Sequence, residues 1–124
     1  MSKLLNDLKG ILRQILDSIE FPDEQKDATI VSIISLVNEY SLIRLLIRLD
    51  EDSQVEFKSL VKDQSDQTKF ILDFLKKHYK KTEVDKILSE EARKLVYEYM
   101  QEIAPLMSDE EKDKVRELLE KYFQ

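Results

Sequence analysis

The chain has 124 residues, 42% apolar and 37% charged, with 26 acidic and 20 basic side chains and a formal net charge of −6. These values are typical of one folded domain and exclude a disordered chain. With no cysteine and one glycine, disulfides, thiolate chemistry and glycine-rich phosphate loops are excluded. The acidic balance disfavours nucleic-acid binding, which usually needs a basic face.

The first predicted element is an amphipathic helix over residues 3–19, within an N-terminal segment 1–20. Its apolar residues recur at helical spacing, and the formal charge of residues 3–20 is zero, which favours packing on protein over an anionic membrane. This stripe either docks internally or pairs with another chain. Gly10 marks either a close backbone neighbour, which we expect, or a functional hinge. The stripe's candidate partner contacts are Leu4, Leu8, Ile11, Ile15 and Ile19.

Charges alternate with leucines over residues 1–20, unlike the unbroken apolar run of a signal peptide. The most apolar stretch, residues 28–49, carries four polar or charged residues that a membrane span rarely tolerates. We therefore expect a cytoplasmic protein with this stretch as a core helix. The four residues are Asn38, Glu39, Arg44 and Arg48.

A long helix over residues 23–49 follows Pro22 and is the central element of the predicted fold. Its polar residues recur at every third position, so they drift about 60° per step around a 3.6-residue helix. Either different neighbours wrap the helix along its length, or it bends near residues 38–41; we favour a central helix with a bend. We expect Asn38 to be a buried polar group that fixes the packing register. The repeating polar residues are Thr29, Ser32, Ser35, Asn38, Ser41 and Arg44.

Three further helices are predicted before residue 105. One covers residues 51–61 with Asp50 as its N-cap, and one covers residues 67–79 with a basic C-terminal end. A third starts at a capping box formed by Thr82 and Asp85, and the acids after Ser89 allow it to restart within its length.

The last helix, over residues 108–124, has a complete capping box in Ser108 and Glu111. No linker divides the chain. The sequence therefore predicts a single all-α domain, a compact bundle of five or six helices over residues 1–124.

The chain offers few groups for a metal or a catalytic site. His78 is the sole histidine, and it stands among lysines, so we expect no structural metal and no cofactor. The acids that start at Asp50 superficially resemble a calcium loop. The glycine and glutamate that an EF-hand requires would be Val55 and Val61, so that match fails. No catalytic residue is assigned.

Two basic groups are candidates for binding. Arg44 and Arg48 lie one turn apart and are either a partly exposed flank paired with acids such as Asp52, or a clamp for a phosphate or carboxylate. The clamp would serve an anion-binding protein or an enzyme. The lysine-rich segment 76–81 either complements a helix end or weakly binds anionic membrane or nucleic acid.

Several segments together resemble a family of small acidic helical proteins of candidate-phyla bacteria, catalogued as a domain of unknown function. The resemblance implies an all-helical core over residues 21–104, with residues 1–20 and 108–124 added to it, and it implies no activity. The segments are Phe21-Pro22-Asp23-Glu24, Leu45-Leu46-Ile47-Arg48-Leu49, the stretch from Asp50 to Phe57, Phe70-Ile71-Leu72-Asp73-Phe74-Leu75 and the stretch from Val84 to Ala92.

From these patterns we predict a non-catalytic helical module for protein–protein interaction, either an adaptor or a self-associating protein. The first helix is its expected contact surface, because an amphipathic helix can lay its apolar side against a partner.

Overall fold

The computed structural model describes the backbone of residues 2–63 and 67–123, and the side chains of residues 7–59, 71 and 73–123. Within these residues the chain forms six α-helices and one short 3-10 helix, with no strand. The predicted all-α fold is therefore confirmed. The elements are α1 (Ser2–Asp17), α2 (Asp23–Ile47), α3 (Glu51–Asp63), α4 (Gln67–His78), α5 (Lys81–Ile103), η1 (Ala104–Leu106) and α6 (Asp109–Phe123).

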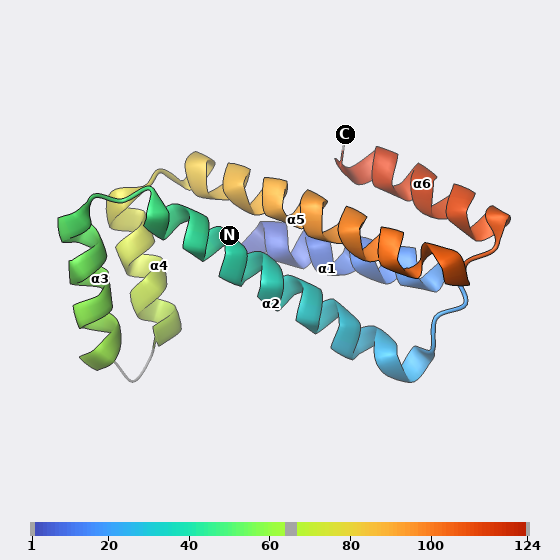
Figure 1. Ribbon diagram of the computed structural model, residues 1–124, viewed down its shortest axis with the longest axis horizontal. Helices are drawn as coiled ribbons and strands as arrows, with labels where there is room; N and C mark the ends of the chain where they lie inside the picture. The colour runs from blue at the N-terminus through green and yellow to red at the C-terminus, as the bar shows by residue number, and fades with distance from the viewer. Residues whose placement is uncertain (1, 64–66, 124) are drawn as a thin grey trace.

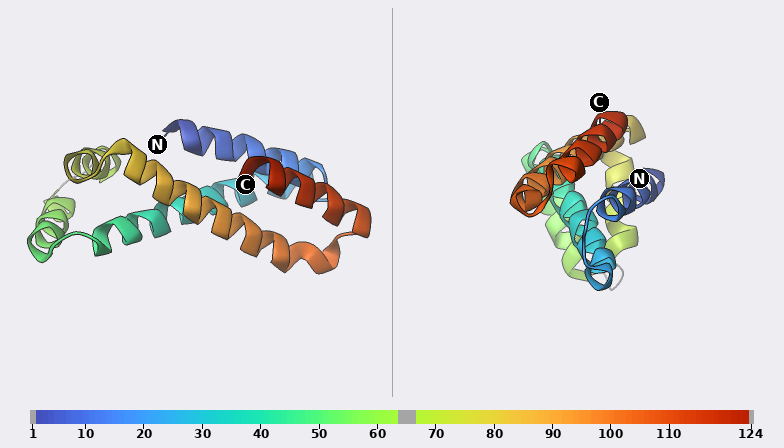
Figure 2. Two further views of the ribbon diagram at one scale, coloured as in Figure 1. Left: turned by 90° about the horizontal axis from the view of Figure 1, so that it is seen from above. Right: turned by 90° about the vertical axis from the view of Figure 1, so that its right-hand side faces the viewer.

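The two longest helices, α2 and α5, make the most extensive helix–helix contact of the bundle. α1 packs against both of them, and α6 packs on α1. Figures 1 and 2 show these four helices running along the length of the molecule, whereas α3 and α4 form a hairpin at one end. The hairpin is inserted between α2 and α5, at the end away from α6.

The main core lies where α1, α2 and α5 meet. Burying one large aliphatic side chain contributes roughly 1.5–3 kcal/mol, so the four buried residues in the described part of α1 anchor it firmly. α6 adds Val115 and Leu119 to the same core. The four residues of α1 are Leu8, Leu12, Ile15 and Leu16, each at most 2% exposed.

α2 is one uninterrupted helix, and its neighbours lie on one side of it. Its buried residues recur at spacings of three and four, which places them on one face. The predicted long helix of the bundle is present, and no break occurs over residues 38–41. Asn38 is exposed, and the buried polar residue of this helix is Ser41. The buried face consists of Ile30, Ile33, Val37, Ser41 and Leu45.

The hydrogen bonds at the start of α6 match the predicted cap, whereas those at the start of α5 involve other residues than predicted. Ser108 N–H donates to Glu111 Oε1 at 2.9 Å, and Glu111 N–H donates to Ser108 Oγ at 3.2 Å, which confirms the predicted box before α6. α5 begins one residue before Thr82, and the reciprocal bond there runs from Lys80 N–H to Glu83 Oε1 at 3.2 Å. α5 continues through residues 89–91 without a restart.

Side-chain bonds attach the hairpin to the end of α2. Asp50 caps α3 by accepting a bond from Ser53 N–H at 2.7 Å, as predicted. The Gln54 amide donates to the carbonyl oxygens of Leu46 and Leu49 at 3.0 and 3.1 Å, and the Leu46 carbonyl also accepts a backbone hydrogen bond from Leu49 N–H at 3.2 Å. On the α4 side, Leu75 belongs to the main core.

Gly10 does not mark a close helix contact. A Cβ atom placed at this position would meet nothing within 4 Å, and the residue is exposed. The prediction of a backbone neighbour there was wrong. α1 is attached to α2 nearer its C-terminal end, by ion pairs from Arg13 to Asp27 and from Lys26 to Asp17.

Candidate functional site

The sequence left open whether the apolar stripe of α1 docks internally or pairs with another chain. In the structure the stripe packs internally and is part of the core. Leu8 and Ile15 are 2% and 0% exposed, and Ile11 and Ile19 are partly buried against the same core. The side chain of Leu4 lies outside the described residues. The four of these residues whose side chains are described therefore pack within the fold, and Leu8 and Ile15 offer no open contact surface.

Arg44 joins α2 to α5 through two ion pairs. Its guanidinium nitrogens lie 2.8 Å from Glu90 Oε2 and 3.1 Å from Glu91 Oε1. The hydrogen bond from Arg44 lowers the pKa of Glu90 below its ordinary value. Arg48 is exposed just after α2. The pair does not form a free anion clamp, and the carboxylates that satisfy Arg44 come from α5 rather than from Asp52.

The lysine-rich segment 76–81 covers the junction of α4 and α5. Lys77 Nζ lies 3.4 Å from Glu56 Oε1 on α3. Tyr79 is partly buried and donates a hydrogen bond from its hydroxyl to the Leu45 carbonyl oxygen at 2.5 Å, and the His78 ring packs on Phe74 with centroids 4.4 Å apart. The tyrosine and the histidine therefore contribute to packing, while the lysines face solvent.

The sequence reasoning missed an apolar surface on the outward side of α2. Four large side chains there are between 39% and 70% exposed, and they follow the spacing i, i+4, i+7 and i+11. On a helix with 3.6 residues per turn these positions fall within about 60° of arc, so they form a continuous strip. We call this strip the outer stripe; it consists of Leu36, Tyr40, Ile43 and Ile47.

A groove of about 670 Å³ runs beside the outer stripe, between α2 and α5. Tyr40 and Ile43 supply apolar surface from α2, and Leu95 supplies it from α5. Charged side chains complete the lining, and they include the ion pairs of Arg44. We call this the α2–α5 groove; its charged residues are Arg44, Glu90, Glu91, Lys94 and Glu98.

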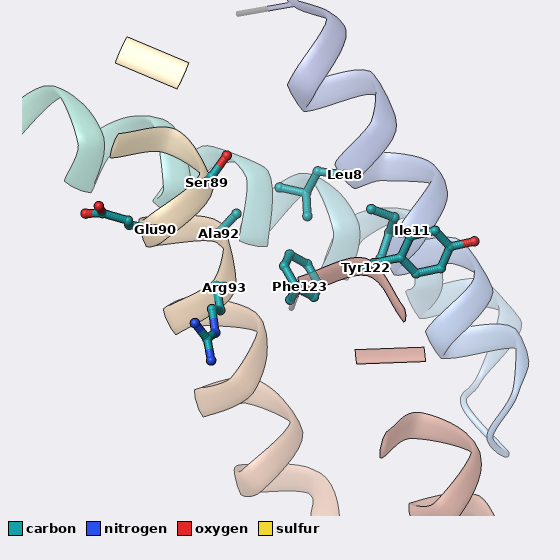
Figure 3. A pocket seen from close by; sticks show the side chains of 8 residues that line it. All are labelled: Leu8, Ile11, Ser89, Glu90, Ala92, Arg93, Tyr122 and Phe123. Carbon is teal, nitrogen blue, oxygen red and sulfur yellow. The ribbon is translucent and has the colours of Figure 1, made fainter. Parts of the chain in front are cut away.

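A smaller hollow of about 300 Å³ lies among α1, α5 and α6 (Figure 3). Leu8, Ile11 and Phe123 form much of its wall, and in Figure 3 the charged ends of Glu90 and Arg93 point away from them. Arg93 instead lies 5.7 Å from the centre of the Tyr97 ring. Polar groups therefore do not converge in this hollow as they do in a catalytic site.

Metal binding and membrane insertion find little support in the described part of the chain. Among the described residues, no group of three or more histidine, cysteine, aspartate or glutamate side chains could hold a metal ion. In the same part of the chain, α2 is the one helix whose length and composition would allow it to cross a membrane, and 28% of its apolar window is buried in the fold. Length and composition alone are weak evidence for a span, because core helices pass the same test.

No protein-family profile, curated protein or solved structure matches the chain. The resemblance to a helical family therefore stays a prediction. Any function has to be inferred from the surfaces described above.

Proposed function

We propose that the protein is a non-catalytic interaction module that binds a helix of a partner protein along the outer stripe of α2. The observation that carries the proposal is the exposure of Leu36, Tyr40, Ile43 and Ile47 in one strip. Taking roughly 200 Å² for a large side chain, the strip exposes about 400 Å², a patch size that is often functional on monomers.

The spacing of the strip suits a helical partner better than a flat or extended one. Steps of four, three and four residues are those of the seam along which two helices interlock their side chains. The adjoining α2–α5 groove gives a second wall, so that a helix lying on the stripe also contacts Leu95 of α5. Helix-in-groove recognition uses this combination of apolar anchors and a lateral wall.

The proposed contact surface lies on α2, whereas the sequence favoured α1. α1 would have to leave the core to expose its stripe. Each of its buried aliphatic residues would then lose roughly 1.5–3 kcal/mol of burial. The outer stripe is accessible without any rearrangement. Interaction therefore remains the proposed function, with α2 in place of α1.

The test is a titration of ¹⁵N-labelled protein with an 18-residue helical peptide that carries leucines at i, i+4, i+7 and i+11 and glutamine elsewhere on its flanks. We expect chemical-shift changes at Tyr40, Ile43 and Leu95, and loss of binding in Ile43→Glu. Shift changes confined to α1 and α6 would contradict the proposal.

The matched control is Val31→Glu, a change on the same helix but away from the outer stripe. Val31 is 60% exposed, so a charged side chain is tolerated there as well as at position 43. It lies about 150° around the helix from the stripe, as follows from 3.6 residues per turn. The variant should therefore bind the peptide as the wild type does.

A further inference from the structure

Acidic side chains outnumber basic ones beside the outer stripe. Glu90, Glu91 and Glu98 of α5 line the groove together with the cations Arg44 and Lys94. Lys86 and Arg48 act electrostatically on Glu90 from outside the lining. On the other side of the stripe Glu39 of α2 is exposed. The helical repeat places it about 70° around from the centre of the stripe. Among the residues that line the groove, three carboxylates against two cations leave a net charge of −1.

The positive charge of Arg44 is already used within the protein. It bonds to both Glu90 and Glu91, and the three groups together keep a charge of −1. The whole chain carries a formal charge of −6. An approaching partner therefore meets a negative field both at long range and at the rim of the groove, which favours cationic partners and repels anionic ones.

The size of the surface argues against a second copy of the chain. Two outer stripes packed face to face would bury about 800 Å² in total, whereas a stable specific interface needs about 1,200–2,000 Å². Each copy would also bring the same acidic rim and the same net charge of −6. A separate helix with basic flanks meets no such repulsion.

We propose that the occupant of the outer stripe and the α2–α5 groove is an amphipathic helix of another protein whose apolar strip is flanked by lysine or arginine. This rests on the proposed function and adds the charge of the partner to it. The apolar residues of the partner cover the outer stripe, and its cations lie near Glu39 and Glu98.

The experiment compares three 18-residue peptides with the same leucine stripe and with lysine, glutamate or glutamine at the flanking positions. Binding to the full chain is measured by fluorescence anisotropy at 50 mM and 500 mM salt. We expect the lysine peptide to bind about tenfold more tightly than the glutamate peptide at low salt. The ratio should fall to about threefold or less at high salt, because salt screens exposed charges.

Two variants separate docking from simple charge attraction. Ile43→Glu makes the protein more negative, so that non-specific attraction of the lysine peptide would strengthen, whereas docking on the stripe predicts its loss. Val31→Glu adds the same charge on another side of α2 and should leave binding unchanged. The double variant Glu39→Lys with Glu98→Lys should reverse the preference toward the glutamate peptide. Circular dichroism checks that each variant keeps its helical content.

Each other outcome identifies which claim fails. Equal binding of the three peptides, lost in Ile43→Glu, overturns the basic partner but not helix binding. No binding of any peptide overturns both claims. A dimer of the wild-type chain that light scattering detects and Ile43→Glu dissociates would assign the stripe to a second copy. Binding to vesicles of phosphatidylcholine and phosphatidylglycerol that Ile43→Glu abolishes would assign it to a membrane. Either of these last two results overturns the proposal.

Discussion

α1 and α2 each carry an apolar stripe at helical spacing, yet the fold uses the two stripes differently. The stripe of α1 is enclosed by α2, α5 and α6, and its central residues Leu12 and Ile15 are fully buried. α2 has two apolar sides, one packed on α5 and α1 and the other open. Periodicity therefore identifies surface that favours contact, but the number of neighbours in the fold decides which surface stays free.

Alanine substitutions in the two stripes give the largest contrast that we predict. Leu12 is fully buried in the core. Its replacement by alanine should lower the free energy of unfolding by about 2–5 kcal/mol, because a cavity remains. Ile47 is 70% exposed. Its replacement by alanine should change the free energy of unfolding by only about 0.5 kcal/mol or less, as surface substitutions usually do.

Urea denaturation followed by circular dichroism measures both values. Equal losses in Leu12→Ala and Ile47→Ala would mean that the outer stripe is covered within the folded chain.

The ion pairs of Arg44 join α2 to α5 beside the outer stripe. Arg44→Ala leaves Glu91, whose side chain is 10% exposed, without its cation, and the side chain of Arg44 itself is 39% exposed. Breaking a fully buried pair costs about 3–5 kcal/mol. Solvent screening of the exposed guanidinium reduces the expected loss to about 1–2 kcal/mol, measured from denaturation curves. Adding Glu91→Gln to this variant should recover part of the loss, and no recovery would contradict a role for the buried carboxylate.

Gly10 offers a change in the opposite direction on α1. A Cβ atom there meets nothing within 4 Å. Gly10→Ala should therefore stabilise the protein by up to about 1 kcal/mol through the better helix propensity of alanine. Thermal unfolding measures this gain. A loss of stability would show that another part of the protein approaches the open side of α1.

The smallest predicted effect concerns the start of α6, which Glu111 also joins to the turn that follows α1. Glu111 accepts hydrogen bonds from Ser108 N–H and from Glu20 N–H, the latter at 2.6 Å, and these bonds lower its pKa below the ordinary value of 4.5. Unfolding restores the ordinary pKa, so this stabilisation is complete above that value and is lost as the pH falls through the lowered one.

Glu111→Gln removes that dependence. The variant should be slightly less stable than the wild type at pH 7 and equally stable at a pH below the lowered pKa of Glu111, so that its melting temperature falls less on acidification. Melting curves recorded from pH 7 down to acid measure the difference. A parallel fall in both proteins would mean that Glu111 titrates alike in the folded and unfolded chains.

The helices and the box at Ser108 could be predicted because they depend on local spacing and on hydrogen bonds over three residues. The free side of α2 could not be predicted with the same certainty. The spacing of Leu36, Tyr40, Ile43 and Ile47 was present in the sequence, but it overlapped the spacing of the buried face. Which of the two faces packs depends on the position of α5. This helix contacts α2 directly, although α3 and α4 separate the two in the sequence.

The partners of Arg44 were beyond prediction for the same reason. Glu90 and Glu91 are 46 and 47 residues away in the chain, and only the pairing of α2 with α5 brings them together. Asp52 was the nearer acid in sequence. Gly10 shows a further limit, because a lone glycine in a helix has the same sequence signature whether its Cβ side faces a neighbour or solvent.

The order of the helices has a consequence for synthesis. A ribosome releases α1 and α2 first, and the main partner of α2 emerges only after the whole of α3 and α4 has been made. During that interval the 25-residue α2 presents both apolar sides to solvent or to any factor that binds hydrophobic nascent segments. We expect the α1–α2 pair to form early and to need protection until translation reaches the end of α5.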